Sequence, residues 1–304
     1  MRYIAIDTNA LSFRSIFNYE RMLMNKRGGT FILPADDTYC TMLISCLKKL
    51  SVDEQTRVFL VQDDHSWRKN YLSSYKDQRA GQRAEHKLIN WAECFQKAND
   101  VTNAIAEGGG FTVLRVKNCE ADDILSVISD YYKNDEVIIV TGDKDLYQLA
   151  ARPNTKIFSY NVKFKGSRGA FVKVDNPYKI IDDKIRKGDV SDNLIVQPNE
   201  QTEDIELRKF LVDLLNLPEF VTIPIKQELS HLTDRQPNFE ALPFKESLAK
   251  RFMEIYTKNN VITPEQCYEY AEKRAKRKAK IAKEKRDAKK DKVTEKDFDR
   301  IKGA

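Results

Sequence analysis

Short apolar runs alternate with stretches of helical spacing over the first half of the chain. Four nearly continuous, β-branched runs have the character of strands covered on both faces: residues 3–6, 58–61, 112–116 and 137–141. Three intervening stretches space their apolar positions as helices do: residues 38–50, 86–106 and 121–132. Strands that alternate with helices predict an α/β fold, with a mainly parallel central sheet flanked by helices.

The pattern changes near residue 177, after which it is mostly helical. Four further helices are predicted: residues 177–187, 203–216, 245–258 and 264–292. Prolines separate these stretches, and we expect them to end helices: Pro198, Pro218, Pro224, Pro237 and Pro243. We therefore expect a smaller, α-helical C-terminal region after the sheet.

Charge is distributed unevenly along the chain. The 304 residues carry a net charge of +6, which suits a polyanionic partner without requiring one. Residues 272–292 hold twelve basic and four acidic residues, a net charge of +8, so the remainder of the chain is slightly acidic. This segment is either a solvated helix or a contact for nucleic acid or for an acidic protein.

The five cysteines show no paired spacing of the CxxC kind, which is typical of reduced thiols inside a cell. The sequence enters the first strand directly, and no apolar run is long enough to span a bilayer. We expect a cytoplasmic protein with no membrane contact.

Acidic residues follow all four predicted strands, at the point where each strand ends. In chain order they are Asp7; Asp63; Glu120, Asp122 and Asp123; and Asp143 and Asp145. A single aspartate in such a place commonly caps the next helix. Because ligands collect outside the carboxyl ends of the strands in α/β sheets, we expect the four groups together to form one acidic cluster.

Carboxylates packed this closely repel each other, so they must hold protons or be neutralised by cations. Oxygen donors without a histidine or cysteine cluster suit a hard ion, Mg²⁺ or Mn²⁺, rather than zinc. Two such ions activate a water molecule and stabilise the leaving oxygen in phosphodiester hydrolysis. The sequence therefore predicts an oxygen-only metal centre with hydrolytic chemistry.

Residues 65–87 mix basic and aromatic side chains directly after Asp63. The basic ones are Arg68, Lys69, Lys76, Arg79, Arg83 and Lys87, and the aromatic ones are Trp67, Tyr71 and Tyr75. Such a mixture suits phosphates and unstacked bases. The alternative is an amphipathic helix whose aromatic side chains lie in the core.

Further along, "KGDVSDN" adds Asp189 and Asp192, which indicate nothing in isolation.

Five segments, in this order and spacing, resemble the flap endonuclease/5′→3′ exonuclease family, and within it the bacteriophage exonucleases and phage ribonuclease H. They are "IAIDTN", "QDDHSWRKNYLSSYKDQR", "EADD", "VTGDKDLYQL" and "KGDVSDN", and the resemblance covers roughly residues 1–195. It implies a PIN-like 5′ nuclease core at 1–187 with a helical arch at about 65–100, a helical DNA-binding region at 188–262, and a basic C-terminal helix at 263–304.

The resemblance also implies roles for single residues. The first Mg²⁺ ion would be held by Asp7, Asp63, Glu120 and Asp122. The second ion or its water shell would be held by Asp143, Asp145, Asp189 and Asp192, with Asp123 near both. Lys76 and Arg79 match arch residues that contact the scissile phosphate, and we expect nucleic acid to contact Arg68, Lys69, Tyr75, Lys76, Arg79 and Arg83.

The implied activity is hydrolysis of phosphodiester bonds in 5′ ends or flaps of DNA and in RNA–DNA hybrids, dependent on two Mg²⁺ ions that Mn²⁺ can replace. The implied setting is removal of primers or flaps during phage DNA replication, by a monomer in the host cytoplasm. A single-stranded-DNA-binding protein or another replication factor is an expected partner.

Beyond residue 195 the resemblance weakens. Cellular members of the family continue with a glycine-rich helix-hairpin-helix, whereas "LIVQPNEQTEDIEL" contains no glycine. The basic helix is the alternative grip on duplex DNA, and its first basic residues are Lys273, Arg274, Lys276 and Arg277.

Two other classes of protein share part of this pattern. A phosphatase of the haloacid-dehalogenase type also begins with an aspartate after its first strand, but it needs a second aspartate where this chain has Asn9. A catalytically inactive nucleic-acid-binding relative would normally have lost carboxylates, whereas here every position is filled.

Overall fold

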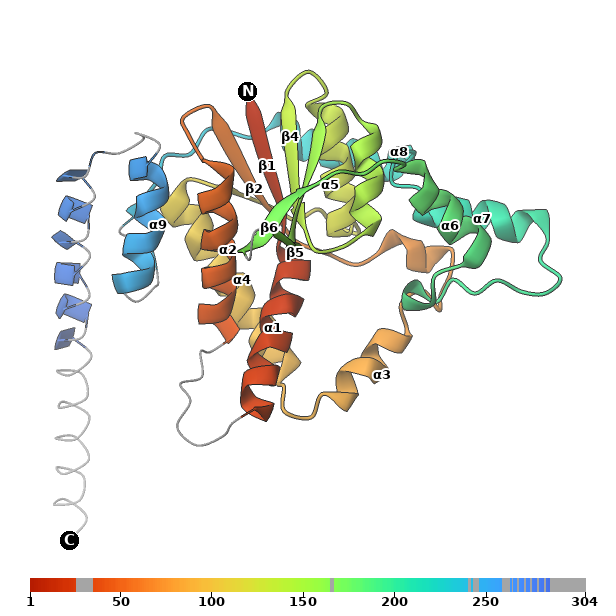
Figure 1. The fold of residues 1–304 in the computed structure, drawn as a ribbon, viewed down its shortest axis with the longest axis horizontal. Coiled ribbons are helices and arrows are strands. Elements are labelled where there is room, and N and C mark those ends of the chain that lie inside the picture. The colour runs from red at the N-terminus through yellow and green to blue at the C-terminus, as the bar shows by residue number, and fades with distance from the viewer. Residues whose placement is uncertain are drawn as a thin grey trace, which may run out of the picture.

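The computed structural model describes residues 1–25, 35–164, 167–239 and 246–258, together with Leu242 and several positions between 263 and 284. Its centre is a six-stranded sheet in the order β3-β2-β1-β4-β5-β6 (Figure 1). The strands are β1 (Arg2–Asp7), β2 (Thr56–Val61), β3 (Thr112–Leu114), β4 (Glu136–Thr141), β5 (Thr155–Phe164) and β6 (Ser167–Val172). All neighbouring strands pair in parallel except β5 and β6, which form an antiparallel hairpin at one edge.

Alternate residues of β1 belong to two different hydrophobic cores. Ile4 and Ile6 face one core, and Tyr3 and Ala5 face the other. Both faces of the sheet are therefore covered, which explains why its central strands are nearly continuous apolar runs. The predicted α/β fold with a mainly parallel sheet is confirmed.

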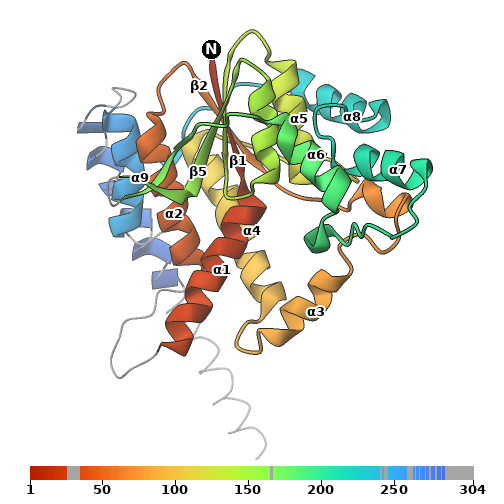
Figure 2. The same ribbon diagram turned by 45° about the vertical axis from the view of Figure 1, so that its right-hand side comes forward.

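Helices cover each face of the sheet (Figures 1 and 2). The first face packs against α1 (Thr8–Met24), α2 (Ala35–Leu50), α4 (Trp91–Gly109) and α9 (Glu246–Lys258). The second packs against α5 (Ala121–Tyr131), α6 (Tyr178–Lys187), α7 (Thr202–Val212) and α8 (Glu219–Ser230). α9 thus lies against α2 in the main core, rather than in a separate C-terminal body.

The segment between β2 and α4 departs from a single amphipathic helix. It consists of a short 3-10 helix, η1 (Trp67–Asn70), a run of turns, and α3 (Gln78–Glu85). α3 stands beyond the carboxyl ends of the parallel strands (Figures 1 and 2). The chain returns through α4, which begins at Trp91 rather than at the predicted residue 86 because Asn90 caps it, accepting a hydrogen bond from the Glu93 N–H.

Several elements were not predicted from the sequence, among them α1, the β5–β6 hairpin and α8. α1 buries polar residues as well as apolar ones, so its apolar spacing is weak. The β5–β6 hairpin lies at one edge of the sheet, and Lys156, Ser159 and Asn161 interrupt the apolar run of β5. α8 contains Pro224, which was expected to end a helix; the buried stripe of Val221, Ile225 and Leu229 compensates for the hydrogen bond that this proline removes.

Every described position from 265 to 284 is helical, as predicted for the start of the basic segment. The rest of that predicted helix, to residue 292, lies outside the described residues. Within the described ranges, no helix combines the length and apolar composition that a membrane span requires.

Candidate metal centre

Because β1, β2 and β4 run in parallel, their carboxyl ends bring acidic residues to one edge of the sheet. Asp7 is the last residue of β1, Asp63 follows β2, and Asp143 follows β4. Glu120 and Asp122 join them from the start of α5. The electrostatic coupling of these groups is strong: Asp63 and Asp143 both act on Asp7, and Asp143 and Asp7 both act on Asp122.

Asp7 caps a helix and belongs to the acidic edge at the same time. Its Oδ1 accepts a hydrogen bond of 2.9 Å from the Ala10 N–H in the first turn of α1. Its Oδ2 accepts one of 3.1 Å from the Thr141 hydroxyl. Burial, followed by the charges of Asp63 and Asp143, raises the pKa of Asp7 to about 7. Asp7 therefore both caps α1 and belongs to the acidic cluster.

The pKa values of Asp63 and Asp122 are also raised, by burial and by neighbouring carboxylates. Burial raises the pKa of Asp63, and the neighbouring charge of Glu120 adds to the effect. Burial and the charges of Asp143 and Asp7 raise the pKa of Asp122 well above its usual range. Asp63 is held by the Ala121 N–H, which donates to its Oδ1 at 2.7 Å. These carboxylates favour protons or cations, as groups in a metal site do.

Glu120 has the opposite environment. Its Oε2 lies 2.8 Å from Arg68 Nη1 and accepts a hydrogen bond of 2.8 Å from the Ser66 hydroxyl. Its Oε1 pairs with the ammonium of Lys76. Burial acts to raise the pKa of Glu120, but Lys76 and Arg68 outweigh it and hold that pKa at about 2. Glu120 is therefore ionised at neutral pH.

Asp123 and Arg68 form a buried ion pair, and both residues contact Glu120. Asp123 is 0% exposed; its Oδ1 lies 2.8 Å from Arg68 Nη2, and its Oδ2 accepts hydrogen bonds from Trp67 Nε1 and from the Glu120 N–H. Arg68 Nε donates to the Leu211 carbonyl at 2.7 Å. With both oxygens engaged, Asp123 is suited to positioning rather than to contact with an ion.

This placement differs from the expectation for two nucleic-acid contacts. Arg68 is 2% exposed and Tyr75 is 3% exposed. The Tyr75 hydroxyl lies 3.3 Å from Asp192 Oδ2 and 3.4 Å from Glu120 Oε2. An arginine is normally a surface residue, and nothing in the sequence shows that this one is surrounded by buried carboxylates.

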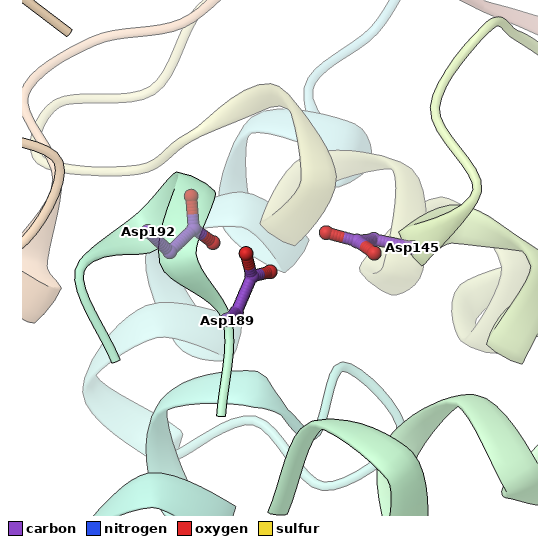
Figure 3. A group of neighbouring side chains, drawn as sticks. All are labelled: Asp145, Asp189 and Asp192. Carbon is purple, nitrogen blue, oxygen red and sulfur yellow. The ribbon is translucent and has the colours of Figure 1, made fainter. Parts of the chain in front are cut away.

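A second group of carboxylates lies beside the first. Ligand oxygens of Asp145, Asp189 and Asp192 all lie within 4.8 Å of one another (Figure 3). Asp145 begins the 3-10 helix η2 (Asp145–Ala151), and Asp189 caps η3 (Val190–Asp192). Burial, then the charge of Asp143, raises the pKa of Asp145 to about 6. The structure thus brings three of the four residues predicted for the second ion into one cluster, with Asp143 coupled to both groups.

One residue of this cluster was missed in the sequence. Lys184, in the last turn of α6, pairs with both Asp145 and Asp189. It belongs to the basic run "KIRK". The only signal in the sequence for a role near the carboxylates is that Asp189 follows five residues later. Thr141 was also missed: its hydroxyl donates to Asp7 and accepts from the Asp143 N–H, and so links the ends of β1 and β4.

Lys76 lies between the two groups of carboxylates, and Arg79 lies beside the second group. Lys76 has a φ of +60°, its N–H donates to the Asp192 carbonyl at 3.2 Å, and its Nζ lies 3.9 Å from Asp192 Oδ1. Arg79 Nη2 lies 2.8 Å from the same Oδ1, and the Arg79 side chain is 37% exposed. Both cations therefore adjoin the carboxylates from the side of α3.

The other predicted nucleic-acid contacts lie further out. Lys69 pairs with Asp77 at the surface, and the Arg83 guanidinium lies 5.9 Å from the Phe13 ring. In the basic segment, Lys273, Lys276 and Arg277 are exposed helical residues, whereas Arg274 lies outside the described residues. Contact of any of these with nucleic acid stays a prediction.

The donor set fits a hard divalent cation. All candidate ligands are carboxylate oxygens, and several carboxyl groups have pKa values raised by burial and by each other. Asp145, Asp189 and Asp192 converge as ligands of one ion would, while Asp7, Asp63, Asp122 and Asp143 are the coupled carboxylates of the other group. Mg²⁺ as the resident ion stays a prediction.

Comparisons with known proteins agree with this geometry. Residues 2–176 match the family described as 5′-3′ exonuclease, N-terminal resolvase-like domain. DNA polymerase I of Mycobacterium leprae is 26% identical over 155 residues, which is 50% of this chain and 16% of the polymerase. The thermostable DNA polymerase I of Thermus thermophilus is 30% identical over 154 residues, 49% of this chain and 17% of the polymerase. The chain thus spans about a sixth of the length of these relatives.

Among solved structures, the T5 D15 protein co-crystallised with metal ions superposes with a TM-score of 0.52 at 18% identity, over 84% of this chain and 99% of that one. This likeness is one of fold. The family match covers more than half of the sequence, including the residues from Asp7 to Asp145, and confirms the resemblance seen in the motifs. The chain belongs to the 5′-3′ exonuclease family and carries its N-terminal resolvase-like domain.

Proposed function

We propose that this protein is a metal-dependent 5′ nuclease, a 5′→3′ exonuclease and flap endonuclease that hydrolyses phosphodiester bonds. The observation that carries the proposal is the pairing of two acidic groups at the carboxyl edge of a parallel sheet, with Lys76 between them and Arg79 beside Asp192. Family membership and the fold shared with the metal-bound T5 D15 protein support it.

The roles of the side chains follow from their surroundings. When bound, divalent ions would supply an activated water and stabilise the leaving oxygen. Asp7, Asp63 and Asp122 would hold one ion, and Asp145, Asp189 and Asp192 the other. Glu120 stays ionised, and its carboxylate keeps the ammonium of Lys76 at the junction of the two groups. Lys76 and Arg79 would then bind and orient the phosphate, with their positive charge directed at the group where negative charge develops.

We further propose Mg²⁺ as the working ion, with Mn²⁺ as a substitute, and DNA with 5′ ends or flaps and RNA–DNA hybrids as substrates. The setting we propose is primer or flap removal in phage DNA replication, with a single-stranded-DNA-binding protein as a candidate partner. The net charge of +8 over residues 272–292 supports a role of that segment in binding the nucleic-acid backbone.

The metal requirement tests the function directly. Cleavage of end-labelled flap, nicked and RNA–DNA hybrid substrates should proceed with Mg²⁺ or Mn²⁺ and cease in EDTA, because the ligands are oxygen-only. Products resolved on denaturing gels give the length of each cleavage and so the balance of exonuclease and endonuclease action. Undiminished cleavage in EDTA would refute the metal mechanism, and no cleavage of any substrate would favour an inactive relative.

Lys76→Met should slow the chemical step more than it weakens substrate binding. The variant keeps most of the side-chain length and removes the ammonium beside Glu120, so single-turnover cleavage should fall by roughly 10²–10³-fold. Lys156→Met is the matched control, since Lys156 at the start of β5 pairs with Glu136 at the surface and should change the rate little. If only the Kd for the flap substrate rises, Lys76 serves in docking alone.

A further inference from the structure

Asp145, Asp189 and Asp192 form the three-aspartate cluster. This cluster also contains a lysine, Lys184, that has no role in the proposed reaction. The Nζ of Lys184 pairs with Asp145 and with Asp189, and the Lys184 side chain is only 14% exposed. These two carboxylates come from different parts of the chain, the loop after β4 and the loop after α6. A single ammonium therefore joins them, as a bound cation would.

The backbone after α6 fixes Lys184 in this place. The Gly188 N–H donates to the Lys184 carbonyl at 3.0 Å and ends the helix, and Gly188 has a φ of +74°. A Cβ at this glycine would collide with the Leu194 carbonyl, so only glycine allows the chain to turn this sharply. The turn places Lys184 and Asp189 side by side, and the Asp189–Leu194 bridge holds the loop closed.

We propose that Lys184 is an internal counter-cation, which occupies the three-aspartate cluster when no divalent ion is bound and leaves it when an ion binds. The inference rests on the proposed function, because it takes the cluster as an ion site. Asp145 and Asp189 are partly buried and repel each other, so the ammonium between them stabilises the metal-free protein. A divalent ion that binds the same oxygens must displace it.

The competition has a measurable size. A ligand that binds only the fraction of molecules with a vacant site has its affinity reduced by that fraction. If Lys184 holds its two carboxylates in about nine-tenths of the metal-free molecules, it weakens the apparent affinity for an ion about tenfold. Removing the ammonium should therefore tighten ion binding, although a residue close to the site has been lost.

Mn²⁺ binding without nucleic acid provides the test, followed by electron paramagnetic resonance and by titration calorimetry. Lys184→Met should bind one Mn²⁺ about tenfold more tightly than the wild type. Lys187→Met is the matched control: Lys187 lies on the same helix, carries the same charge and pairs with Asp183 at the surface. Its affinity should stay within about twofold of the wild type. Equal or weaker binding by Lys184→Met would overturn the inference.

Stability in chelator gives a second readout. In EDTA, Lys184→Met should melt at a lower temperature than Lys187→Met, because Asp145 and Asp189 then repel each other without a counter-charge. Saturating Mn²⁺ should close this difference. A difference that persists unchanged in Mn²⁺ would assign Lys184 a purely structural part and overturn the displacement.

If Lys184→Met does not fold, the release of Lys184 can be tested in the wild-type protein. Labelling with an amine-specific reagent, read by mass spectrometry, should rise several-fold at Lys184 when Mn²⁺ is added and stay unchanged at Lys187. Unchanged labelling of Lys184 at saturating Mn²⁺ would contradict its release.

These outcomes separate the inference from the proposed function. Asp145→Asn should abolish the Mn²⁺ site; if the wild type binds no Mn²⁺ at all, the metal mechanism and the inference fail together. If the wild type binds Mn²⁺ and cleaves DNA but Lys184→Met does not bind more tightly, only the counter-cation role fails.

Discussion

Asp122→Asn should abolish hydrolysis and at the same time stabilise the metal-free protein. Burial and the charges of Asp143 and Asp7 raise the pKa of Asp122 well above its usual range, so its ionised form is costly without a cation. The amide removes that cost and also a ligand, and single-turnover cleavage with Mg²⁺ should fall by at least about 10³-fold. The melting temperature in EDTA should rise, by roughly 2–4 °C for each kcal/mol gained.

Asp130→Asn is the control for this change. Asp130 lies on the same helix, α5, but it is exposed and pairs with Lys226 at 3.1 Å. The same substitution there should leave both the cleavage rate and the melting temperature nearly unchanged. If Asp122→Asn instead destabilised the protein in EDTA, the carboxylate would be a structural residue. Full activity of the variant would remove Asp122 from the metal centre.

The metal-free protein should lose stability as the pH rises from about 4 to about 7, opposite to the usual behaviour of carboxylates. The folded state raises the pKa of Asp7 from 3.8 to about 7. Between these values the folded chain keeps a proton that the unfolded chain has released, so the free energy of unfolding falls with pH.

Other titrating groups leave this sign intact. The pKa of Asp145, raised to about 6, acts in the same direction. Glu120 has a lowered pKa of about 2, so the stability that it contributes is lost only at still lower pH. Urea unfolding in EDTA at about pH 5 and about pH 7 should therefore show the lower stability at the higher pH.

Mg²⁺ should reverse the trend, because ion binding needs deprotonated ligands and stabilises only the folded state. Asp7→Asn should flatten the slope measured in EDTA. A slope that is identical in EDTA and in Mg²⁺ would show that these carboxylates do not bind the ion.

Four strands of the sheet could be predicted because burial on both faces produces nearly continuous apolar runs in the sequence. The runs at 3–6, 58–61 and 137–141 became β1, β2 and β4, and the run at 112–116 became the shorter β3. Where tertiary packing compensates for a poor local signal, prediction failed. Pro224 lies inside α8, and the polar residues Ser12 and Glu20 are buried in α1.

The acidic residues could be assigned to one edge of the sheet because parallel topology fixes where strands end. Their partners could not be found in this way. Whether Arg68 binds a phosphate or a buried carboxylate depends on Leu211, which is 143 residues further along the chain. Lys184 and its exposed neighbour Lys187 lie in the same basic stretch of sequence. Only the fold shows that Lys184 pairs with Asp189 and Lys187 with Asp183 at the surface.

The site is completed by a part of the chain that follows the sheet, which bears on how the protein is synthesised. All six strands are complete by Val172, and the family domain ends at residue 176. Asp189 and Asp192 come later, and so does Leu211, whose carbonyl anchors Arg68 beneath Glu120. Since chains emerge from the ribosome in order, all the strands are synthesised before these residues of the candidate site. A nascent chain that has just completed its strands therefore still lacks Asp189, Asp192 and Leu211, and the candidate site is complete only once the segment up to Leu211 has been synthesised.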